Sequence, residues 1–287
     1  MILPCVVSVT LPRALARLAA LLLLTAQLLL AAGPASAQTK PPPAKIPAGV
    51  DLALVLAVDA SRSIDDWEYN LQREGYVTAF NDPQVVKAIR SGPYGAIAVS
   101  YVEWSSDDQQ AVLADWTLIR DADSAAAFAA KLKASERHFM ARTSISGGVD
   151  FSVAMLGESG LHATRRAIDV SGDGVNNRGR PVHEARDDAV KAHITINGLA
   201  IINDRPQGWG PPIPLDEYYR DHVIGGPGAF LIVAKDFQSF GEAIRRKLVM
   251  EIAGCAPPYA GICAKAAGKG EAQVLRPEPA GGGKGPS

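Results

Sequence analysis

The chain has 287 residues, of which 47% are hydrophobic and 21% are charged, and its 29 basic and 30 acidic residues give a formal net charge of −1. This length allows one large domain with its own core. The balanced charge provides no basic surface, so the composition argues against binding to nucleic acid or to anionic lipid.

Residues 1–37 are typical of a signal peptide. Two arginines form a basic start, a leucine-rich apolar stretch covers residues 18–32, and small residues at 35–37 suit signal-peptidase cleavage. The alternative is an uncleaved membrane anchor, but a run of about 15 apolar residues is short for the roughly 20 that a spanning helix needs. We expect export to the periplasm or the medium, with no membrane insertion after removal of this segment. The remaining chain has 27 basic and 30 acidic residues, a net charge of −3.

Strand and helix patterns alternate from residue 51 onward. The preceding residues 38–50 contain three consecutive prolines and are expected to form an extended linker. The alternation indicates one domain over residues 51–253. We expect strands at 52–58, 96–102, 111–119, 167–171, 194–201 and 230–233, and helices at about 64–80, 121–134, 144–156, 182–192, 215–222 and 237–252. Ser63 is expected to cap the first helix, with Asp66 as its partner in a capping box.

These elements predict an α/β fold. The first strand, residues 52–58, is apolar throughout, as expected for a strand buried on both faces of a parallel sheet. A short turn at residues 105–108 allows the third strand to return antiparallel to the second. We therefore expect a Rossmann-like, doubly wound and mostly parallel sheet with one antiparallel strand and helices on both faces.

The tail, residues 254–287, lies outside the strand–helix alternation. Cys5 belongs to the signal segment, so Cys255 and Cys263 remain as an even pair in a compartment that permits disulfides, and we expect them to pair. The alternative is two buried free thiols. Beyond Cys263 the chain is rich in glycine, proline and alanine, and we expect most of it to be disordered because it offers little apolar surface to bury.

Oxygen-bearing side chains follow the first predicted strand. Asp59-Ala60-Ser61-Arg62-Ser63 places one acid and two hydroxyls at alternate positions. Thr143 follows at the start of a predicted helix, and Asp173 just beyond the fourth strand. Because ligands in such sheets bind beyond the carboxyl ends of the strands, we expect these side chains to converge at one edge. Their oxygens suit a hard divalent cation, Mg²⁺ first, with Mn²⁺ or Ca²⁺ as alternatives.

These five side chains, in their order along the chain, resemble the metal-ion-dependent adhesion site (MIDAS) of von Willebrand factor type A (vWA) domains. The run Tyr-Val-Glu-Trp-Ser-Ser at residues 101–106 also resembles that family's second strand. Over residues 51–253 the chain is most similar to an uncharacterised group of secreted bacterial proteins with this domain alone. The resemblance implies that the hydroxyl ligands are Ser61, Ser63 and Thr143. It also implies two carboxylates that act directly or through water, Asp59 and Asp173.

The resemblance implies a binding protein rather than an enzyme. Such a protein would capture an Asp or Glu carboxylate of a protein partner through the bound cation. Two alternatives stay open: a Mg²⁺-dependent phosphohydrolase with Asp59 as nucleophile, and a scaffold of the same fold without metal. Residue 61 is serine rather than a second acid, which argues against the phosphohydrolase. Trp209, in the long loop of residues 203–212, is a candidate partner contact.

Overall fold

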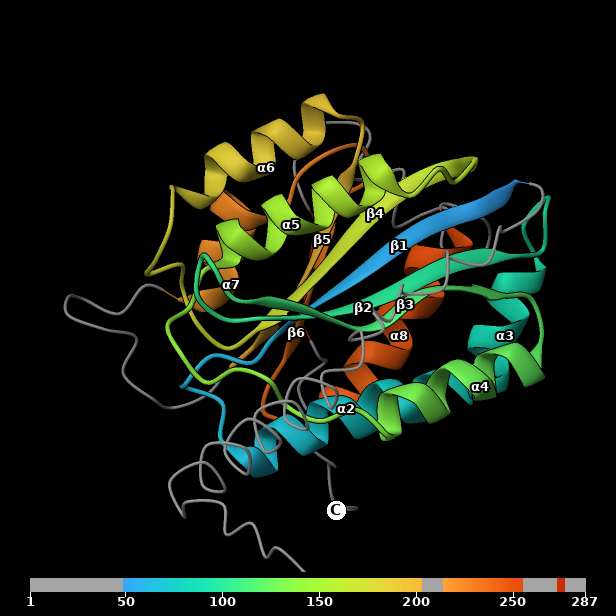
Figure 1. The fold of residues 1–287 in the computed structure, drawn as a ribbon, viewed down its shortest axis with the longest axis horizontal. Helices are drawn as coiled ribbons and strands as arrows, with labels where there is room; N and C mark the ends of the chain where they lie inside the picture. The colour runs from blue at the N-terminus through green and yellow to red at the C-terminus, as the bar shows by residue number, and fades with distance from the viewer. Residues whose placement is uncertain (1–48, 203–213, 255–272, 277–287) are drawn as a thin grey trace, which may run out of the picture. The chain divides into compact units, whose positions relative to one another are not determined.

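A mostly parallel sheet lies at the centre of this computed structural model (Figure 1), which describes residues 49–202, 214–254 and 273–276. Within these residues the strands are β1 (Val50–Asp59), β2 (Ile97–Trp104), β3 (Gln110–Ile119), β4 (Ala163–Gly172), β5 (Thr195–Ile201), β6 (Phe230–Ala234) and β7 (Gln273–Leu275). Their order is β3-β2-β1-β4-β5-β6-β7. All neighbours pair in parallel except β2 and β3, which are antiparallel. This confirms the predicted mostly parallel sheet with one antiparallel strand.

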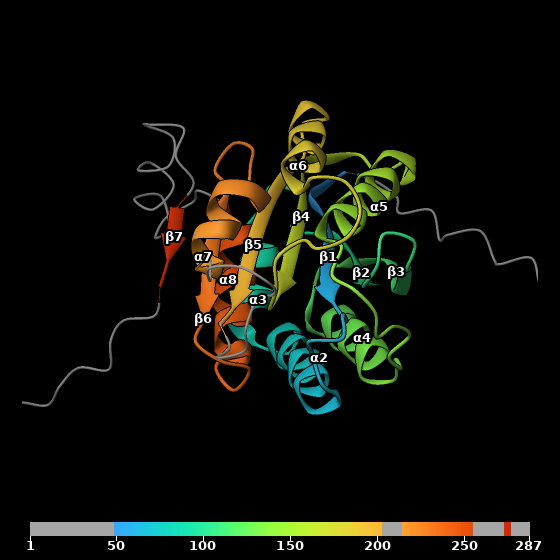
Figure 2. The ribbon, with the colours of Figure 1, turned by 90° about the vertical axis from the view of Figure 1, so that its left-hand side faces the viewer.

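Helices cover both faces of the sheet (Figure 2). One face carries α2 (Asp66–Phe80), α3 (Pro83–Arg90), α4 (Ala122–Lys133) and α8 (Phe240–Ala253). The other face carries α5 (Ile145–Glu158), α6 (Val182–Lys191), α7 (Leu215–Tyr218) and the π-helical turn η1 (Tyr219–Val223). The doubly wound α/β architecture is therefore confirmed. Among the described helices, none combines the length and apolar character that crossing a membrane needs.

Strand β1 is buried over its whole length, which explains its unbroken apolar sequence. Leu52, Leu54 and Leu56 pack toward the face of α2, α4 and α8. The smaller side chains between them, Ala53 and Val55, pack toward α5 and α6. Because both faces are packed, the carboxyl end of β1 is held firmly in place.

Helix α2 begins two residues later than predicted, and Ser63 does not cap it. Asp65 is the cap: its Oδ1 accepts hydrogen bonds from the N–H groups of Trp67 and Glu68, each at 2.9 Å. The Glu68 side chain accepts from the Asp65 N–H at 2.9 Å, which completes a capping box. The prediction of a box formed by Ser63 and Asp66 was wrong, because the Ser63 hydroxyl donates to a carboxylate elsewhere in the fold.

Two short elements were not predicted. Helix α3 starts directly after α2, with Asp82 as its cap and Pro83 at its first position. Strand β7 extends the sheet beside β6, and its Val274 and Leu275 pack against the core. It lies in the stretch for which we expected disorder. The exposed edge of β6 accounts for the strand, because such an edge offers unpaired backbone groups.

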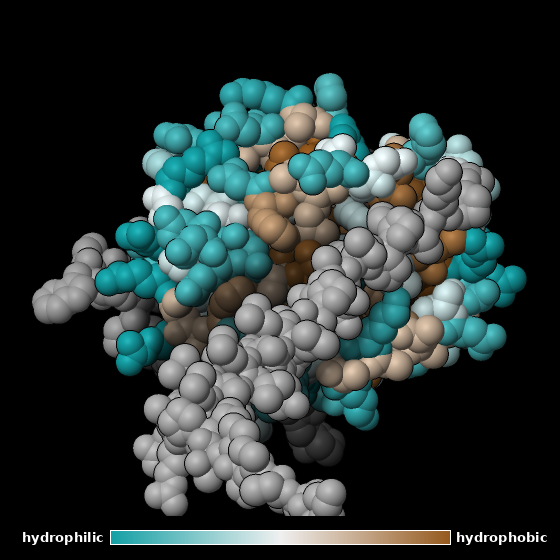
Figure 3. Space-filling view, in the orientation of Figure 1, coloured by the Kyte–Doolittle hydropathy of each residue, from teal (hydrophilic) through white to brown (hydrophobic). Residues whose placement is uncertain are grey.

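Edge strand β3 is only half-buried, in contrast to β1. Figure 3 shows apolar residues between the hydrophilic outer surfaces of α5 and α6 on one side and of α4 on the other, where Figure 1 places β3. Trp116 and Leu118 of this strand pack partly against the core. One long side of the sheet therefore ends in a partly apolar strand.

The carboxyl ends of β1 and β4 lie side by side, since Val58 pairs with Ser171. From β1 the chain moves on to β2, whereas from β4 it moves in the opposite direction to β5. This reversal is a topological switch point, where open α/β sheets bind their ligands. Figure 2 looks onto this edge of the sheet.

Candidate metal centre

Asp59, the last residue of β1, folds back onto the loop that follows it. Its Oδ1 accepts a hydrogen bond from the Ser61 N–H at 2.7 Å, and the Ser61 carbonyl accepts one from the Ile64 N–H at 3.1 Å. Asp59 and Ser61 are fully buried. An aspartate that bonds to the backbone two residues ahead stabilises a tight turn, and this turn fixes the position of Ser61.

Ser63 connects this loop to the end of β4. Ser61 Oγ lies 3.1 Å from Ser63 Oγ, and the Ser63 hydroxyl donates to Asp173 Oδ1 at 2.6 Å. Ser63 and Asp173 are 110 residues apart in the sequence, and Asp173 is fully buried. Four of the five predicted site residues therefore form one continuous series of contacts, from Asp59 through both serines to Asp173.

Thr143 is held at the same edge through its backbone. Its N–H donates to Asn177 Oδ1 at 3.0 Å, and its carbonyl accepts from the Asn177 N–H at 2.8 Å. The Ala141 carbonyl accepts from the Arg62 N–H at 2.8 Å. The segment that carries Thr143 is thus tied both to the loop that begins at Asp173 and to the loop of Ser61 and Ser63.

The neighbouring Asn176 strengthens this connection. Its Oδ1 accepts from the N–H of Ser146 at 3.0 Å, and its Nδ2 donates to the carbonyl groups of Arg178 and Arg180. From the sequence, Asn176 and Asn177 were expected to follow Asp173 at the same edge and to build the loop rather than to orient a ligand. The available signal was the pair itself, because asparagine side chains readily bond to backbone groups in turns.

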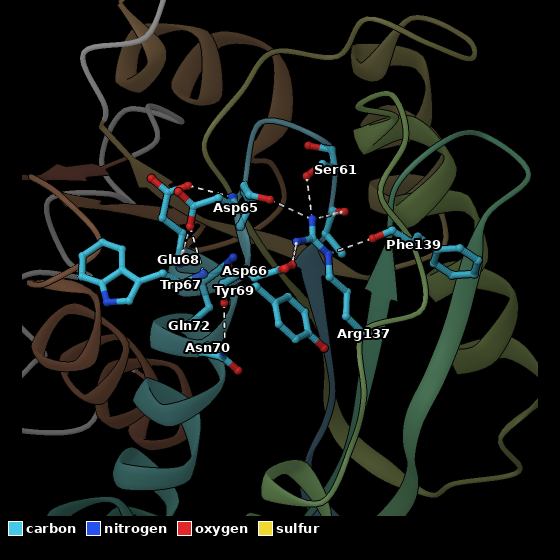
Figure 4. A network of polar contacts seen from close by, with 12 residues as sticks. Ser61, Asp65, Asp66, Trp67, Glu68, Tyr69, Asn70, Gln72, Arg137 and Phe139 are labelled. Carbon is cyan, nitrogen blue, oxygen red and sulfur yellow. Dashed lines mark hydrogen bonds and ion pairs between the residues drawn. The ribbon is translucent and has the colours of Figure 1, made fainter.

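Arg137, which the sequence analysis did not identify, holds the Ser61 loop in place from the segment before Thr143 (Figure 4). Its Nη1 also lies 3.1 Å from Asp66 Oδ1. The guanidinium lies over the ring of Tyr69, 5.2 Å from its centroid. It donates at 2.8 to 3.0 Å to the backbone carbonyls of Ala60, Ser61, Ile64 and Phe139.

The electrostatics of the site fit a cation. Asp59 Oδ2 is buried and has no hydrogen-bond partner among the described residues. Burial and the negative charge of Asp173 raise the pKa of Asp59 to about 8. A buried carboxylate needs a hydrogen bond or a positive charge to remain ionised, and a divalent cation between the two aspartates would supply that charge.

The donor set favours a hard cation. In residues 49–202, 214–254 and 273–276, no group of three His, Cys, Asp or Glu side chains is placed to hold a metal. The serine and threonine hydroxyls would therefore have to complete the coordination of any metal bound at Asp59 and Asp173. Neutral and anionic oxygens are the donors that Mg²⁺ prefers, whereas structural zinc sites use thiolate and imidazole.

Tyr219 of η1 adds a second polar atom beside Asp59. Its side chain is fully buried, and its hydroxyl has no hydrogen-bond partner in the part of the chain that the structure describes. Burial and the charge of Asp59 raise the pKa of Tyr219 well above its usual value. A Cβ at Gly172 would lie 2.8 Å from both Asp59 Oδ2 and the Tyr219 hydroxyl, so only glycine leaves room here. No sequence signal marked Tyr219, which lay within a predicted helix.

Three predicted residues lie outside the described residues. They are Trp209, the candidate partner contact, and the expected disulfide pair Cys255 and Cys263. The signal segment and residues 38–48 of the linker also lie outside them.

Comparison with known proteins identifies the family and the fold. The family model described as "Protein of unknown function (DUF1194)" matches residues 49–256. No curated protein matches the chain.

Solved structures with the same fold include three that match 71% of this chain. A von Willebrand factor type A structure from Catenulispora acidiphila has a TM-score of 0.50 and 12% identity, over 43% of its own chain. Proximal thread matrix protein 1 from the mussel byssus has a TM-score of 0.51 and 13% identity, over 48% of its chain. The pilus adhesin SpaC from Lactobacillus rhamnosus GG has a TM-score of 0.51 and 16% identity, over 31% of its chain.

The matched region spans less than half of each of these structures, and identities this low establish a shared fold alone. The strand order, the single antiparallel pair and the helices on both faces agree with that likeness. The chain therefore belongs to the DUF1194 family, and its described domain has the vWA fold.

Proposed function

We propose that this protein is an exported binding protein that captures a carboxylate of a protein partner through a divalent cation at the carboxyl ends of β1 and β4. The observation that carries the proposal is the series of contacts from Ser61 through Ser63 to Asp173. Beside it lies the buried Oδ2 of Asp59, which has no hydrogen-bond partner within the described part of the chain. Burying two carboxylates close together costs free energy, and a positive charge between them offsets that cost.

Each proposed ligand has a distinct electrostatic role. Asp59 and Asp173 balance a doubly charged ion, directly or through water, whereas the hydroxyls of Ser61, Ser63 and Thr143 coordinate without adding charge. When bound, the cation would supply an electrophilic centre that attracts an anionic oxygen of the partner. Mg²⁺ fits this donor set best, with Mn²⁺ and Ca²⁺ as alternatives.

The named similarities support protein binding outside the cytoplasm. One similar structure is a pilus adhesin and another is a matrix protein of the mussel byssus. We carry over from them only the general idea of a protein partner. In the same proposal, residues 1–37 are a signal peptide, 38–50 a linker, 51–253 the binding domain, and 254–287 a tail with a Cys255–Cys263 disulfide. Trp209 remains the proposed partner contact.

A phosphohydrolase is less well supported by the geometry. Asp59 is fully buried, and its Oδ1 already bonds to the Ser61 N–H. The guanidinium of Arg137 is engaged with backbone carbonyls rather than directed at a phosphoryl group. Phosphatase activity that disappears in Asp59→Asn would favour the enzyme instead.

Titration calorimetry with Mg²⁺ and with Mn²⁺ tests the metal centre. We expect saturable binding by the wild-type protein and none by Ser61→Ala/Ser63→Ala. Ser106→Ala, in the β2–β3 turn, is the matched control and should bind as wild type does, because the Ser106 hydroxyl bonds only to Asp107 among the described residues. Equal binding heats for wild type and the double variant would support the scaffold without metal.

Affinity capture from the exporting cell tests the partner. The immobilised mature protein should retain an interacting protein that a chelator releases and that Mg²⁺ restores. Ser61→Ala/Ser63→Ala should retain none of it. An interactor that binds equally well with chelator present would contradict capture through the cation.

A further inference from the structure

A second buried charged cluster lies under α8, separate from the candidate metal centre. It contains Lys247 and Glu251 of α8 and Asp169 of β4, and none of the three is more than 2% exposed. Lys247 Nζ lies 2.5 Å from Asp169 Oδ1 and 3.4 Å from Glu251 Oε2. The proposed function makes no use of these residues.

The contact between Lys247 and Asp169 does not have the geometry of a hydrogen bond. Neither oxygen of Asp169 has a hydrogen-bond partner in the described chain, although Nζ is so close to Oδ1. Because a C–O bond is about 1.2 Å long, the Asp169 Cγ lies within roughly 3.8 Å of Nζ, close to the separation of a near-attack pair.

Burial favours the neutral form of Asp169. Burial raises the pKa of Asp169 to about 7. The positive charge of Lys247 opposes this rise, and the negative charge of Glu251 adds to it. The Phe230 ring lies 5.4 Å from Lys247 Nζ and adds apolar surface around it. Transfer of one proton from the ammonium to the carboxylate yields an amine that faces a carboxylic acid, which is a reactive pair.

Glu251 is positioned to move protons between these groups. Its Oε1 accepts a hydrogen bond from Asn197 Nδ2 at 2.7 Å, which orients the carboxylate. Its other oxygen, Oε2, is the one that faces Lys247. A carboxylate that lies 3.4 Å from the nucleophile, and close enough to Asp169 to raise its pKa, can act as general base and then as general acid.

We propose that Lys247 and Asp169 become joined by an isopeptide bond that forms spontaneously inside the folded domain. The neutral Nζ attacks Cγ of the protonated Asp169, so that the Nζ–Cγ bond forms and the bond from Cγ to the hydroxyl breaks. Glu251 accepts a proton from Nζ and returns it to the departing hydroxyl. One water molecule leaves, and no oxidant, reductant or other reactant is needed.

The bond would fasten α8 covalently to the central sheet. Non-covalent contacts already hold the end of this helix, because the Arg165 guanidinium donates to the carbonyls of Glu251 and Ile252 at 2.8 and 2.7 Å. An amide at Lys247 would make the attachment permanent. Its formation does not depend on metal at the β1–β4 edge, so the two proposals stand or fall separately.

Peptide mapping of the denatured, reduced and alkylated mature protein tests the bond. Trypsin does not cleave after an acylated lysine, so we expect residues 167–178 linked to residues 247–265, with a combined mass lower by one water molecule than that of the two peptides. Fragmentation should place the link between Asp169 and Lys247. Full recovery of separate peptides 167–178 and 248–265 from wild type would overturn the proposal and leave the cluster ionic.

Two variants on α8 test the role of Glu251. Glu251→Gln keeps an acceptor for Asn197 but cannot relay protons, so we expect the linked fraction to fall by at least about tenfold at equal times, since general acid–base catalysis contributes roughly 10²–10⁴-fold. Glu242→Gln, on the exposed side of the same helix, should remain linked like wild type. A fully linked Glu251→Gln would overturn the assigned role. The wild-type map decides on the bond itself even if a variant fails to fold.

Discussion

At the end of β1, Asp59 combines a structural contact with an unsatisfied charge. One oxygen holds the turn at Ser61, whereas the other has no hydrogen-bond partner among the described residues. Its neighbour Asp173 is also fully buried. Without a cation, the fold must therefore retain a proton here that the unfolded chain would release.

That proton leads to a prediction about pH. An unfolded aspartate has a pKa of 3.8, and the folded Asp59 has a raised pKa of about 8. Between these values the folded state binds more protons than the unfolded state, so the chelated protein should lose stability as the pH rises from about 4 to about 8. Saturating Mg²⁺ should remove this component of the slope, because the cation keeps both carboxylates ionised.

Urea unfolding across this pH range, with chelator and with Mg²⁺, makes the measurement. The unfolding midpoints in the two conditions should diverge as the pH rises. Parallel midpoint profiles with chelator and with Mg²⁺ would speak against a cation at Asp59.

A second prediction concerns Arg137. In Arg137→Met the carbonyls of Ala60, Ser61 and Ile64 lose the hydrogen bonds from the guanidinium, and a buried group left unsatisfied costs about 1–3 kcal/mol. Because that loop positions Ser61 and Ser63, we expect Mg²⁺ affinity measured by calorimetry to fall by about tenfold or more.

Arg73→Met is the matched control for Arg137→Met. Arg73 also lies over the Tyr69 ring, 5.7 Å from its centroid, but it donates to the Ser135 carbonyl rather than to the Ser61 loop. Arg73→Met should lower the free energy of unfolding without lowering the affinity for Mg²⁺. An equal loss of Mg²⁺ affinity in both variants would contradict a specific positioning role for Arg137.

Among the elements, the start of α2 shows where local patterns are ambiguous. Two pairs of residues fit the pattern of a helix cap followed by an acid three residues later: Ser63 with Asp66, and Asp65 with Glu68. The fold chooses Asp65, because Ser63 bonds instead to Asp173, far away in sequence. Likewise, Asn81-Asp82-Pro83 ends one helix and begins the next, since aspartate and proline also favour a helix start.

A third prediction separates these two neighbouring residues. Asp65→Ala removes the cap and should lower stability by about 1 kcal/mol, with little change in Mg²⁺ affinity. Ser63→Ala should cause a marked loss of Mg²⁺ binding. With chelator present it should also lower stability by about 1–3 kcal/mol, because the buried Asp173 loses the hydrogen bond from Ser63. Urea unfolding and calorimetry on the same samples give both values. A similar pair of effects for the two variants would mean that Ser63 acts only in folding.

The elements were largely predictable, whereas the supporting residues of the site were not. An unbroken apolar run marked β1, and a short turn marked the antiparallel return of β3. The proposed ligands stood out because each follows a strand or starts a helix. Arg137 and Tyr219 had no such marker, since their partners lie far away in the sequence and only tertiary structure brings them together.

For the whole molecule, the two proposals predict separable effects on unfolding. A cation that binds only the folded state adds about 2.7 kcal/mol to the free energy of unfolding when its concentration is a hundred times its Kd. Mg²⁺ should therefore raise the melting temperature and a chelator should reverse the change. The Ser61→Ala/Ser63→Ala variant should not respond. A wild-type melting temperature that is insensitive to both additions would argue against the metal centre without affecting the isopeptide bond.

The order of the strands also bears on how the protein is made. All five proposed ligands lie between residues 59 and 173, and strands β1 to β4 form one contiguous half of the sheet. A ribosome synthesises that half before β5, β6 and α8. The exported polypeptide therefore carries every proposed ligand for the ion in the portion that is synthesised first, ahead of its last helix.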